Sequence, residues 1–400
     1  MKKLFFLIAI CFSLAAGAQK YEGLALTPPM GWNSWNTFQT RINEKLVMDI
    51  ADVMVTSGMR DAGYTYIVLD DGWMAKERDA GGNIIADPEK FPHGLKALAD
   101  YIHSKGLKFG LYNCAGTRTC ADYPGTRGYE YQDARFYASQ DVDYLKFDWC
   151  NSEGINAKEA YSTMSKALKA AGRPIIFSLC EWGQNKPWLW AANVGHLWRT
   201  TGDISAQFEG MKKMGNWSAN SVMKILDLQD GLRQYAGPGH WNDPDMMEVG
   251  NGLTESENRA HFTMWCMLAA PLIAGNDLRK MDASTKDILS NKEVIAVNQD
   301  SLGVQGFRYA VKDSLETWLK PLSNGDWAVC FLNRKSAPQA VDFNWQHEVI
   351  NDSLSKRVLD AKAITYRLRN LWTGKEAGTT KKALKAVVPA EDVLLLRLVK

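Results

Sequence analysis

The chain has 400 residues, 46% of them hydrophobic and 23% charged, which suits one large domain followed by a smaller one. Its 47 lysines and arginines nearly balance its 45 aspartates and glutamates. This neutrality excludes a protein whose main partner is nucleic acid or an anionic membrane surface, and neutral molecules are the expected partners.

The first residues predict a secretory signal peptide over positions 1–18. Two lysines precede an apolar run from Leu4 to Ala16, and small residues mark a cleavage site after Ala18. The alternative, an N-terminal membrane anchor, is disfavoured because the run is shorter than the roughly 20 residues that a spanning helix needs. No later segment is long and apolar enough to span a bilayer. We therefore expect a secreted or periplasmic protein.

From Met30 to about Asn298, short apolar strand signals alternate with amphipathic helical stretches. The expected strands are Met30–Asn33, Tyr66–Asp70, Lys108–Tyr112, Tyr144–Asp148, Ile175–Cys180, His196–Arg199, His240–Trp241 and Leu272–Ala274. The helical stretches include Glu44–Ser57, Gly94–Ser104, Ala157–Ala171 and Glu255–Leu268. Eight such units match a (β/α)₈ barrel in count and length. The rival, an open doubly wound sheet, has little support, because no G-x-G-x-x-G follows the first strand.

After about Leu302 the pattern changes to short strands separated by turns such as Ser323–Asp326. The strand candidates are Ser314–Leu319, Trp327–Leu332, Ala340–Phe343, Tyr366–Leu371 and Asp392–Leu398. This spacing is typical of an antiparallel β-sandwich. We therefore predict three parts: a signal peptide over 1–18, a catalytic barrel over 19–302 and a C-terminal antiparallel β domain over 303–400.

The fourth expected strand carries a candidate nucleophile. Side chains alternate along a strand, so Tyr144, Lys146 and Asp148 share one face, and Leu145 and Phe147 share the other. In a barrel the apolar pair faces the helices, which places Asp148 at the carboxyl end of the strand, where barrel enzymes carry their chemistry. A lysine two residues earlier favours the ionised carboxylate that a nucleophile requires. The alternative for this segment is a purely structural Lys–Asp pair.

Polar and aromatic residues follow most of the other strands. Besides Asp148, they are Trp35, Asp70, Asp71, Tyr112, Glu181, Trp182, Arg199, Asp203 and Asp245. Any one of them could be structural. Carboxylates after strands 2, 4, 5, 6 and 7 on one rim cost free energy to bury, unless a hydroxyl-rich substrate, cations or a metal satisfies them.

Five ordered motifs make the resemblance specific. Met30–Trp35, Leu69–Trp73, Leu145–Cys150, Cys180–Trp182 and Trp241–Met246 closely resemble the α-galactosidases of glycoside hydrolase family 27, the melibiases. The resemblance runs in order from about Leu24 to Asp300, and the C-terminal β domain fits it. It implies a retaining, exo-acting hydrolase that releases terminal α-galactose from an oligosaccharide or glycoconjugate and needs no cofactor.

The resemblance also assigns roles. It implies that Asp148 is the nucleophile and Asp203 the acid/base, and that Cys120 and Cys150 form a disulfide. It places galactose contacts at Trp35, Asp70, Asp71, Tyr112, Lys146, Glu181, Trp182, Arg199 and Asp245. Glu181 resembles the galactose-selective version of its loop. The segment Gly195–Leu197 lacks the cysteine that pairs with the position of Cys180 in animal relatives, so Cys180 is expected to be a free thiol.

Four other functions stay open at this stage. On the same scaffold they are a β-L-arabinopyranosidase and an α-N-acetylgalactosaminidase. From other classes they are a catalytically dead galactoside-binding protein and a metal-dependent hydrolase built on His240, Asp243 and Asp245. The metal site is disfavoured, because that group holds one histidine and Pro244 fixes a turn between the two acids. The oligomeric state is not predicted.

Overall fold

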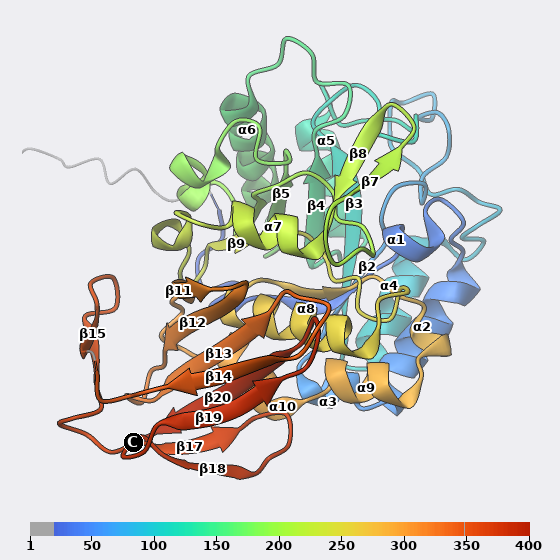
Figure 1. Ribbon diagram of the computed structural model, residues 1–400. Helices are drawn as coiled ribbons and strands as arrows, with labels where there is room; N and C mark the ends of the chain where they lie inside the picture. The colour runs from blue at the N-terminus through green and yellow to red at the C-terminus, as the bar shows by residue number, and fades with distance from the viewer. Residues whose placement is uncertain (1–19, 348) are drawn as a thin grey trace, which may run out of the picture.

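A computed structural model describes residues 20–347 and 349–400, so the predicted signal peptide lies outside the described residues. In the described part, eight parallel strands lie in the order β10-β1-β2-β3-β4-β5-β6-β9 and curl into a barrel with helices outside it (Figure 1). The strands are β1 (Met30–Asn33), β2 (Tyr66–Val68), β3 (Lys108–Cys114), β4 (Tyr144–Asp148), β5 (Ile176–Cys180), β6 (Leu197–Arg199), β9 (Trp241–Asp243) and β10 (Leu272–Ala274). This confirms the predicted (β/α)₈ barrel.

A β-bridge just beyond the end of β9 closes the barrel. Met247 pairs in parallel with Ala274 of β10, and its backbone N–H donates to the carbonyl of Ile273 at 2.7 Å. The loop after β9 is thereby held against β10. Closure therefore brings the residues that follow β9 to the same rim as those that follow β1 and β2.

The alternation along β4 sorts its side chains as predicted. Leu145 and Phe147 belong to the large hydrophobic core shared with the helices. Tyr144 belongs instead to a small separate cluster, with Tyr66, Ile176 and other strand residues. Because neighbouring strands contribute to this second cluster, it marks the barrel interior. Asp148 shares the parity of Tyr144 and so ends β4 on the inward face.

The helices cover the outside of the barrel and pack through apolar faces (Figure 1). Asn43 caps α2, Asn156 caps α6, and Thr254 with Glu257 forms a capping box at the start of α8. The helices are α1 (Trp35–Phe38), α2 (Glu44–Thr56), α3 (Met59–Ala62), α4 (Gly94–Ser104), α5 (Glu130–Ser139), α6 (Ala157–Ala170), α7 (Val222–Leu228), α8 (Glu255–Met267), α9 (Ala283–Leu289) and α10 (Lys292–Asn298), with 3₁₀ turns η1 (Pro187–Leu189), η2 (Ala191–Asn193), η3 (Arg233–Tyr235) and η4 (Leu278–Lys280). No described helix is long and apolar enough to cross a membrane.

A hairpin absent from our strand predictions interrupts the regular alternation after β6. Strands β7 (Met211–Met214) and β8 (Trp217–Asn220) pair antiparallel around the two-residue turn Gly215-Asn216. Gly215 has φ +69°, as the first central residue of a type II′ turn requires. Figure 1 shows the hairpin projecting from the rim that carries the loops after β3 and β4.

The C-terminal domain is the predicted antiparallel β-sandwich. Its main sheet has the order β11-β12-β13-β20-β17-β18, and the pair β14-β19 packs on it through a core that includes Trp327, Phe331 and Trp345. Its strands are β11 (Phe307–Lys312), β12 (Leu315–Pro321), β13 (Trp327–Asn333), β14 (Gln339–Phe343), β15 (Val349–Asp352), β16 (Arg357–Asp360), β17 (Arg367–Asn370), β18 (Glu376–Thr379), β19 (Leu384–Val388) and β20 (Val393–Val399). Five of these, β11, β15, β16, β18 and β19, are absent from the sequence-based list.

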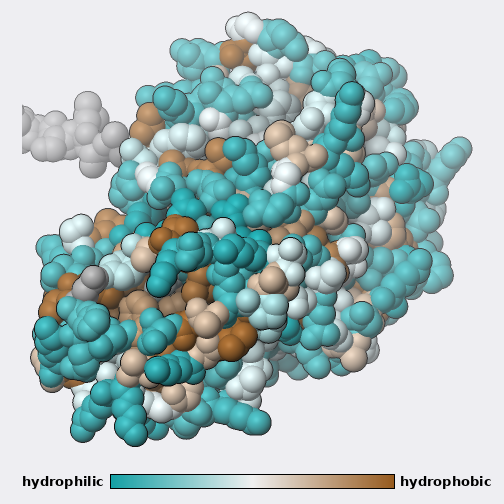
Figure 2. Space-filling view, in the orientation of Figure 1, coloured by the Kyte–Doolittle hydropathy of each residue, from teal (hydrophilic) through white to brown (hydrophobic). Residues whose placement is uncertain are grey.

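The main sheet of this domain also packs against the barrel at α8. Cys330 and Leu395 join the barrel core, and Arg259 of α8 forms an ion pair with buried Asp392. Trp372 donates from its Nε1 to Thr263 of α8 at 3.0 Å. The domain's tryptophans therefore serve packing. In Figure 2 the visible face is largely hydrophilic, with apolar residues in small separate patches.

Candidate active site

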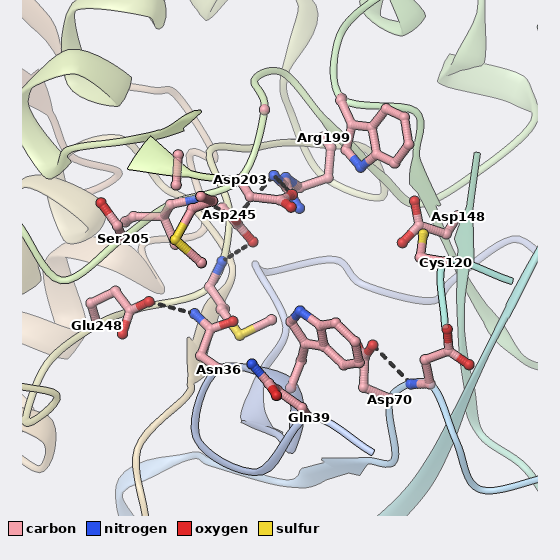
Figure 3. A pocket seen from close by; sticks show the side chains of 18 of the residues that line it. Asn36, Gln39, Asp70, Cys120, Asp148, Arg199, Asp203, Ser205, Asp245 and Glu248 are labelled. Carbon is pink, nitrogen blue, oxygen red and sulfur yellow. Dashed lines mark hydrogen bonds and ion pairs between the residues drawn. The ribbon is translucent and has the colours of Figure 1, made fainter. Parts of the chain in front are cut away.

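A cavity of about 850 Å³ opens at the carboxyl ends of the barrel strands. Its walls come from the segments after β1, β2, β3, β4, β5, β6 and β9 and from the β7–β8 hairpin (Figure 3). The residues proposed from the sequence that line it are Trp35, Asp70, Asp71, Tyr112, Cys120, Lys146, Asp148, Cys150, Trp182, Arg199, Asp203 and Asp245. One fold-level event, the closing of the barrel, thus gathers side chains from distant parts of the chain.

Asp148 lies at the end of β4 and is only 6% exposed. Its Oδ1 accepts a hydrogen bond from the backbone N–H of Trp149 at 2.8 Å. Burial raises the pKa of Asp148 to about 7; the nearby charge of Lys146 lowers it, and the negative charge of Asp203 raises it further. The carboxyl is therefore protonated in acid and loses its proton as the pH rises through about 7.

Lys146 acts on Asp148 from a distance. Its Nζ donates to Oδ2 of Asp70 at 2.7 Å, and that oxygen also accepts from Asn33. We expected Lys146 to keep Asp148 ionised, and the structure supports only the direction of this effect on the pKa of Asp148. Lys146 lowers the pKa of Asp148, but burial outweighs it, because the ammonium makes its ion pair with Asp70.

Asp71 presents an unsatisfied acceptor at the cavity wall. Its Oδ2 accepts from the backbone N–H of Ala121 at 2.8 Å, whereas its Oδ1 is buried and has no partner. Burial raises the pKa of this carboxyl to about 6. The Asp71 carboxyl therefore borders the cavity while the backbone of Ala121 holds one of its oxygens.

A disulfide between Cys120 and Cys150 borders the same wall, which confirms the predicted pairing. The hydroxyl of Tyr112 donates to Cys120 Sγ at 3.4 Å. Cys180 is a buried free thiol, as expected. The disulfide therefore ties the loop after β3 to the loop that begins beside Asp148.

Across the cavity, Arg199 lies between two carboxylates. Its Nη2 is 3.1 Å from Oδ1 of Asp203 and 2.9 Å from Oδ2 of Asp245. The arginine side chain is 4% exposed and that of Asp245 is 6% exposed, whereas 41% of the Asp203 side chain is exposed. Burial raises the pKa of Asp245 although Arg199 opposes the shift. Arg199 thus orients Asp203 while part of the Asp203 side chain stays open to the cavity.

Two cavity residues have the left-handed backbone that side chains other than glycine rarely adopt. Asp245 has φ +97° and Trp182 has φ +59°. The oxygens of Asp245 accept from the backbone N–H groups of Ile204 and Met246 in addition to Arg199. Such strain persists only where surrounding contacts enforce it, and it concentrates at functional sites.

The structure corrects the placement of Glu181. This residue does not line the cavity; it is buried, and its Oε2 accepts from the backbone and side chain of Asn185. Glu181 directly follows Cys180 on β5, so it falls on the opposite face, and the backbone turn at Trp182 then directs the indole into the cavity. Glu181 therefore stands apart from the predicted residues that the structure brings together at the cavity.

Sequence reasoning missed part of the lining. Asn36 and Asn251 donate to the two oxygens of Glu248, at 2.6 Å each, and all three residues border the cavity. Burial raises the pKa of Glu248 to about 7. Glu248 lies three residues after Asp245, so its place beyond the same strand was an available signal. The cavity face of the β7–β8 hairpin was missed as well, although Gly-Asn between two runs is a hairpin signal.

The side chains proposed for a metal site are otherwise engaged. Asp245 pairs with Arg199, Asp243 Oδ1 accepts from the backbone N–H of Asp245, and His240 stacks on Trp198. Within residues 20–347 and 349–400, a close grouping of possible metal ligands occurs at Cys120, Asp148 and Cys150, and both cysteines are consumed by the disulfide. Neither arrangement offers the ligand set of a hydrolytic metal centre.

Comparison with known proteins gives one consistent result. Residues 27–300 match the family described as Alpha galactosidase A, and residues 312–398 match the Alpha galactosidase C-terminal beta sandwich domain. The chain is 54% identical to Alpha-galactosidase A of Cellvibrio japonicus, over 98% of this chain and 96% of that protein.

Two solved structures of α-galactosidases are also similar to this chain. The crystal structure of α-galactosidase I from Mortierella vinacea has a TM-score of 0.86 at 36% identity, over 94% of this chain and 98% of that one. The α-galactosidase of Saccharomyces cerevisiae with raffinose has a TM-score of 0.86 at 33% identity, over 96% and 99% of the two chains.

Proposed function

The chain belongs to the α-galactosidases of glycoside hydrolase family 27 and is a galactose-releasing glycoside hydrolase, and from this premise we propose that it works with retention of configuration, through Asp148 and Asp203. The observation that supports the proposal is their arrangement. The two carboxyls face one cavity from different sides (Figure 3). They lie close enough together for the negative charge of Asp203 to raise the pKa of Asp148. A retaining glycosidase needs two such carboxyls flanking one glycosidic bond.

In the first step, the Asp148 carboxylate attacks the anomeric carbon of galactose. Asp203, in its protonated form, gives its proton to the departing oxygen, and a covalent galactosyl-enzyme forms on Asp148. In the second step, Asp203 as a carboxylate takes a proton from water, which attacks the same carbon from the side of the leaving group. Two inversions at one carbon return galactose in the α configuration.

Arg199 suits this exchange of proton. It remains charged and pairs with Asp203 in the carboxylate form, which the second step requires. The exposed part of the Asp203 carboxyl leaves room for a leaving group or for water. Asp148 needs no access to solvent, because it attacks the anomeric carbon and exchanges no proton with water. Its burial fits a group that reacts only with a bound sugar ring.

Galactose is the sugar we propose for the space between the two acids. Polar groups for sugar hydroxyls are present at Asp71, Lys146 and Asp245, and Trp35 and Trp182 add aromatic surface. The same-scaffold alternatives are β-L-arabinopyranosidase and α-N-acetylgalactosaminidase. Hydrolysis of the three corresponding nitrophenyl glycosides under identical conditions separates them, and we expect the α-galactoside to be preferred.

Proton NMR of the sugar released from α-galactosides tests identity and stereochemistry together. We expect α-galactose as the first-formed product, before mutarotation. A first product in the β configuration would exclude the covalent route through Asp148. Binding of galactosides without turnover would instead indicate a sugar-binding protein on the same fold.

We also propose export of the protein from the cytoplasm. The support is the sequence of positions 1–18, together with the Cys120–Cys150 disulfide, a bond typical of oxidising compartments. Expression of the whole chain in a bacterium, followed by fractionation and N-terminal sequencing, tests it. We expect the mature chain to begin at Gln19 outside the cytoplasm; an uncleaved cytoplasmic chain would overturn this proposal.

A further inference from the structure

The β7–β8 hairpin presents one of its faces to the cavity. Directly opposed residues of an antiparallel pair lie on the same face, and here Lys212 opposes Ala219 and Met214 opposes Trp217. All four of these residues line the cavity. Of the other parity, Ser218 on β8 also borders the cavity, whereas Met211 on β7 does not and is 56% exposed. We call the face that carries Lys212, Met214, Trp217 and Ala219 the inner face of the hairpin.

This inner face is apolar where it reaches furthest. Met214 and Trp217 flank the turn and are 37% and 46% exposed. Among residues 20–347 and 349–400, Trp217 is the one tryptophan in the exposed class; the others are buried or partly buried. An indole held at the mouth of a water-filled cavity contributes little to the core. It does offer a flat surface to the apolar face of a ring.

The base of the hairpin is fastened to the segment that carries Asp203. The backbone N–H of Asn220 donates to the carbonyl of Asp203 at 2.8 Å, and the backbone N–H of Ser205 donates to the carbonyl of Asn220 at 2.8 Å. Ile204 and Asn220 also form a parallel bridge. The acid and the hairpin are thus parts of one hydrogen-bonded unit.

The position of Asp203 determines on which side of the cavity the leaving group lies. The leaving oxygen must lie at Asp203 to receive its proton, so the ring bonded to that oxygen lies on the Asp203 side of the cavity. A second hollow lies beside the Cys120–Cys150 disulfide, between the segment after β4 and the segment after β5 that carries Trp182 and Asn185. The hairpin is hydrogen-bonded to the segment that carries Asp203, and no residue of that segment borders the second hollow, so the hairpin adjoins the leaving group.

Resting on the function proposed above, we propose that the inner face of the hairpin binds the sugar ring that carries the α-galactosyl group. Trp217 stacks on the apolar face of that ring, with Met214 beside it. Lys212, whose charge also acts on Glu248, donates to ring hydroxyls. A cavity of about 850 Å³ is in the upper range of small-molecule sites and holds more than one sugar ring.

Two substrates isolate this contact. One is a disaccharide of galactose joined α-1,6 to glucose, which places a ring on the hairpin. The other is α-galactosyl fluoride, which has no second ring. We expect Trp217→Ala to lower kcat/KM on the disaccharide about tenfold, mainly through KM, and to leave kcat/KM on the fluoride within about twofold of wild type. Inhibition by free galactose should not change, and Trp217→Phe should recover most of the loss.

Met211→Ala is the matched control, because it removes an exposed methionine from the outer face of the same hairpin. We expect it to match wild type on both substrates. Equal loss on disaccharide and fluoride after Trp217→Ala, or no loss on the disaccharide, would overturn the assignment. Asp148→Asn tests the proposed function separately, because it should abolish turnover of both the disaccharide and the fluoride whatever the hairpin binds.

Discussion

Asp148 is buried at the end of β4 beside a disulfide, whereas 41% of the Asp203 side chain is exposed on the loop after β6, beside Arg199. Asp148 makes no direct ion pair within the described residues, and a backbone N–H supports one of its oxygens. Asp203 is paired with Arg199, and its backbone carbonyl accepts a hydrogen bond from Asn220 at the base of the β7–β8 hairpin.

The difference shows how one residue type can serve two roles. A carboxyl that attacks carbon gains from a fixed, water-poor position, while a carboxyl that exchanges protons with leaving group and water needs access to both. Burial raises the pKa of Asp148, and Lys146 acts against that shift from its ion pair with Asp70. Four predictions test this contrast.

The largest expected effect is that of Asp148→Asn. It should lower kcat by at least about 10⁴-fold on every α-galactoside, because no covalent intermediate can form. Steady-state rates on the disaccharide and the fluoride measure it. In Asp148→Gly, azide should enter from the vacated face and give β-galactosyl azide. Substantial residual turnover in Asp148→Asn would remove Asp148 from its role.

Asp203→Asn should depend on the leaving group. We expect a loss of about 10²–10⁴-fold in kcat/KM on the disaccharide, whose alkoxide needs a proton, and a far smaller loss on α-galactosyl fluoride, whose fluoride does not. Azide should then accelerate turnover and yield α-galactosyl azide. Equal losses on both substrates would mean that Asp203 is not the acid.

The burial of Asp148 should also be visible in stability. A carboxyl whose pKa is about 7 folded against an ordinary 3.8 unfolded holds its proton more tightly in the folded state. The free energy of unfolding therefore falls as pH rises from about 4 to about 7 and stays low above that. Asp148→Asn should be more stable than wild type at pH 8, on the order of 2–4 kcal/mol, with no gain at pH 3.

Thermal or urea unfolding at the two pH values measures this difference. Asp122→Asn is the control, because the Asp122 side chain is 85% exposed and should show no comparable gain. A wild-type protein as stable as Asp148→Asn at pH 8 would show that ionised Asp148 is not strained by its burial.

The smallest effect concerns the coupling between the two acids. Because the negative charge of Asp203 raises the pKa of Asp148, Asp203→Asn should move the acid limb of kcat/KM to lower pH. The pH profile on α-galactosyl fluoride measures it, since that substrate needs no acid. A limb that stays in place, or moves to higher pH, would mean that the two carboxyls do not interact.

Local pattern was enough to predict much of this molecule. β1, β4 and β10 begin and end where their apolar and polar residues alternate, and α4 ends where its amphipathic run ends. Asp148 could be identified from the sequence because a carboxylate at the carboxyl end of a barrel strand lies on the rim where barrel enzymes carry their active sites. The hairpin was missed because β7 and β8 are short and mostly exposed, so they carry no core pattern. Glu181 was expected at the cavity, but it directly follows Cys180 at the end of β5 and therefore falls on the other face of that strand.

The order of the elements, the choice of fold and the reactive residue types follow from the sequence alone, because each depends on neighbours a few positions away. The tertiary structure decided which groups meet: Lys146 pairs with Asp70 across 76 positions, and Arg199 pairs with Asp245. Burial and partners set the charge of a carboxyl, and both arise from contacts that only the closed barrel makes. The same closure placed Trp217 at the mouth of the cavity, where no local signal could assign it a ligand.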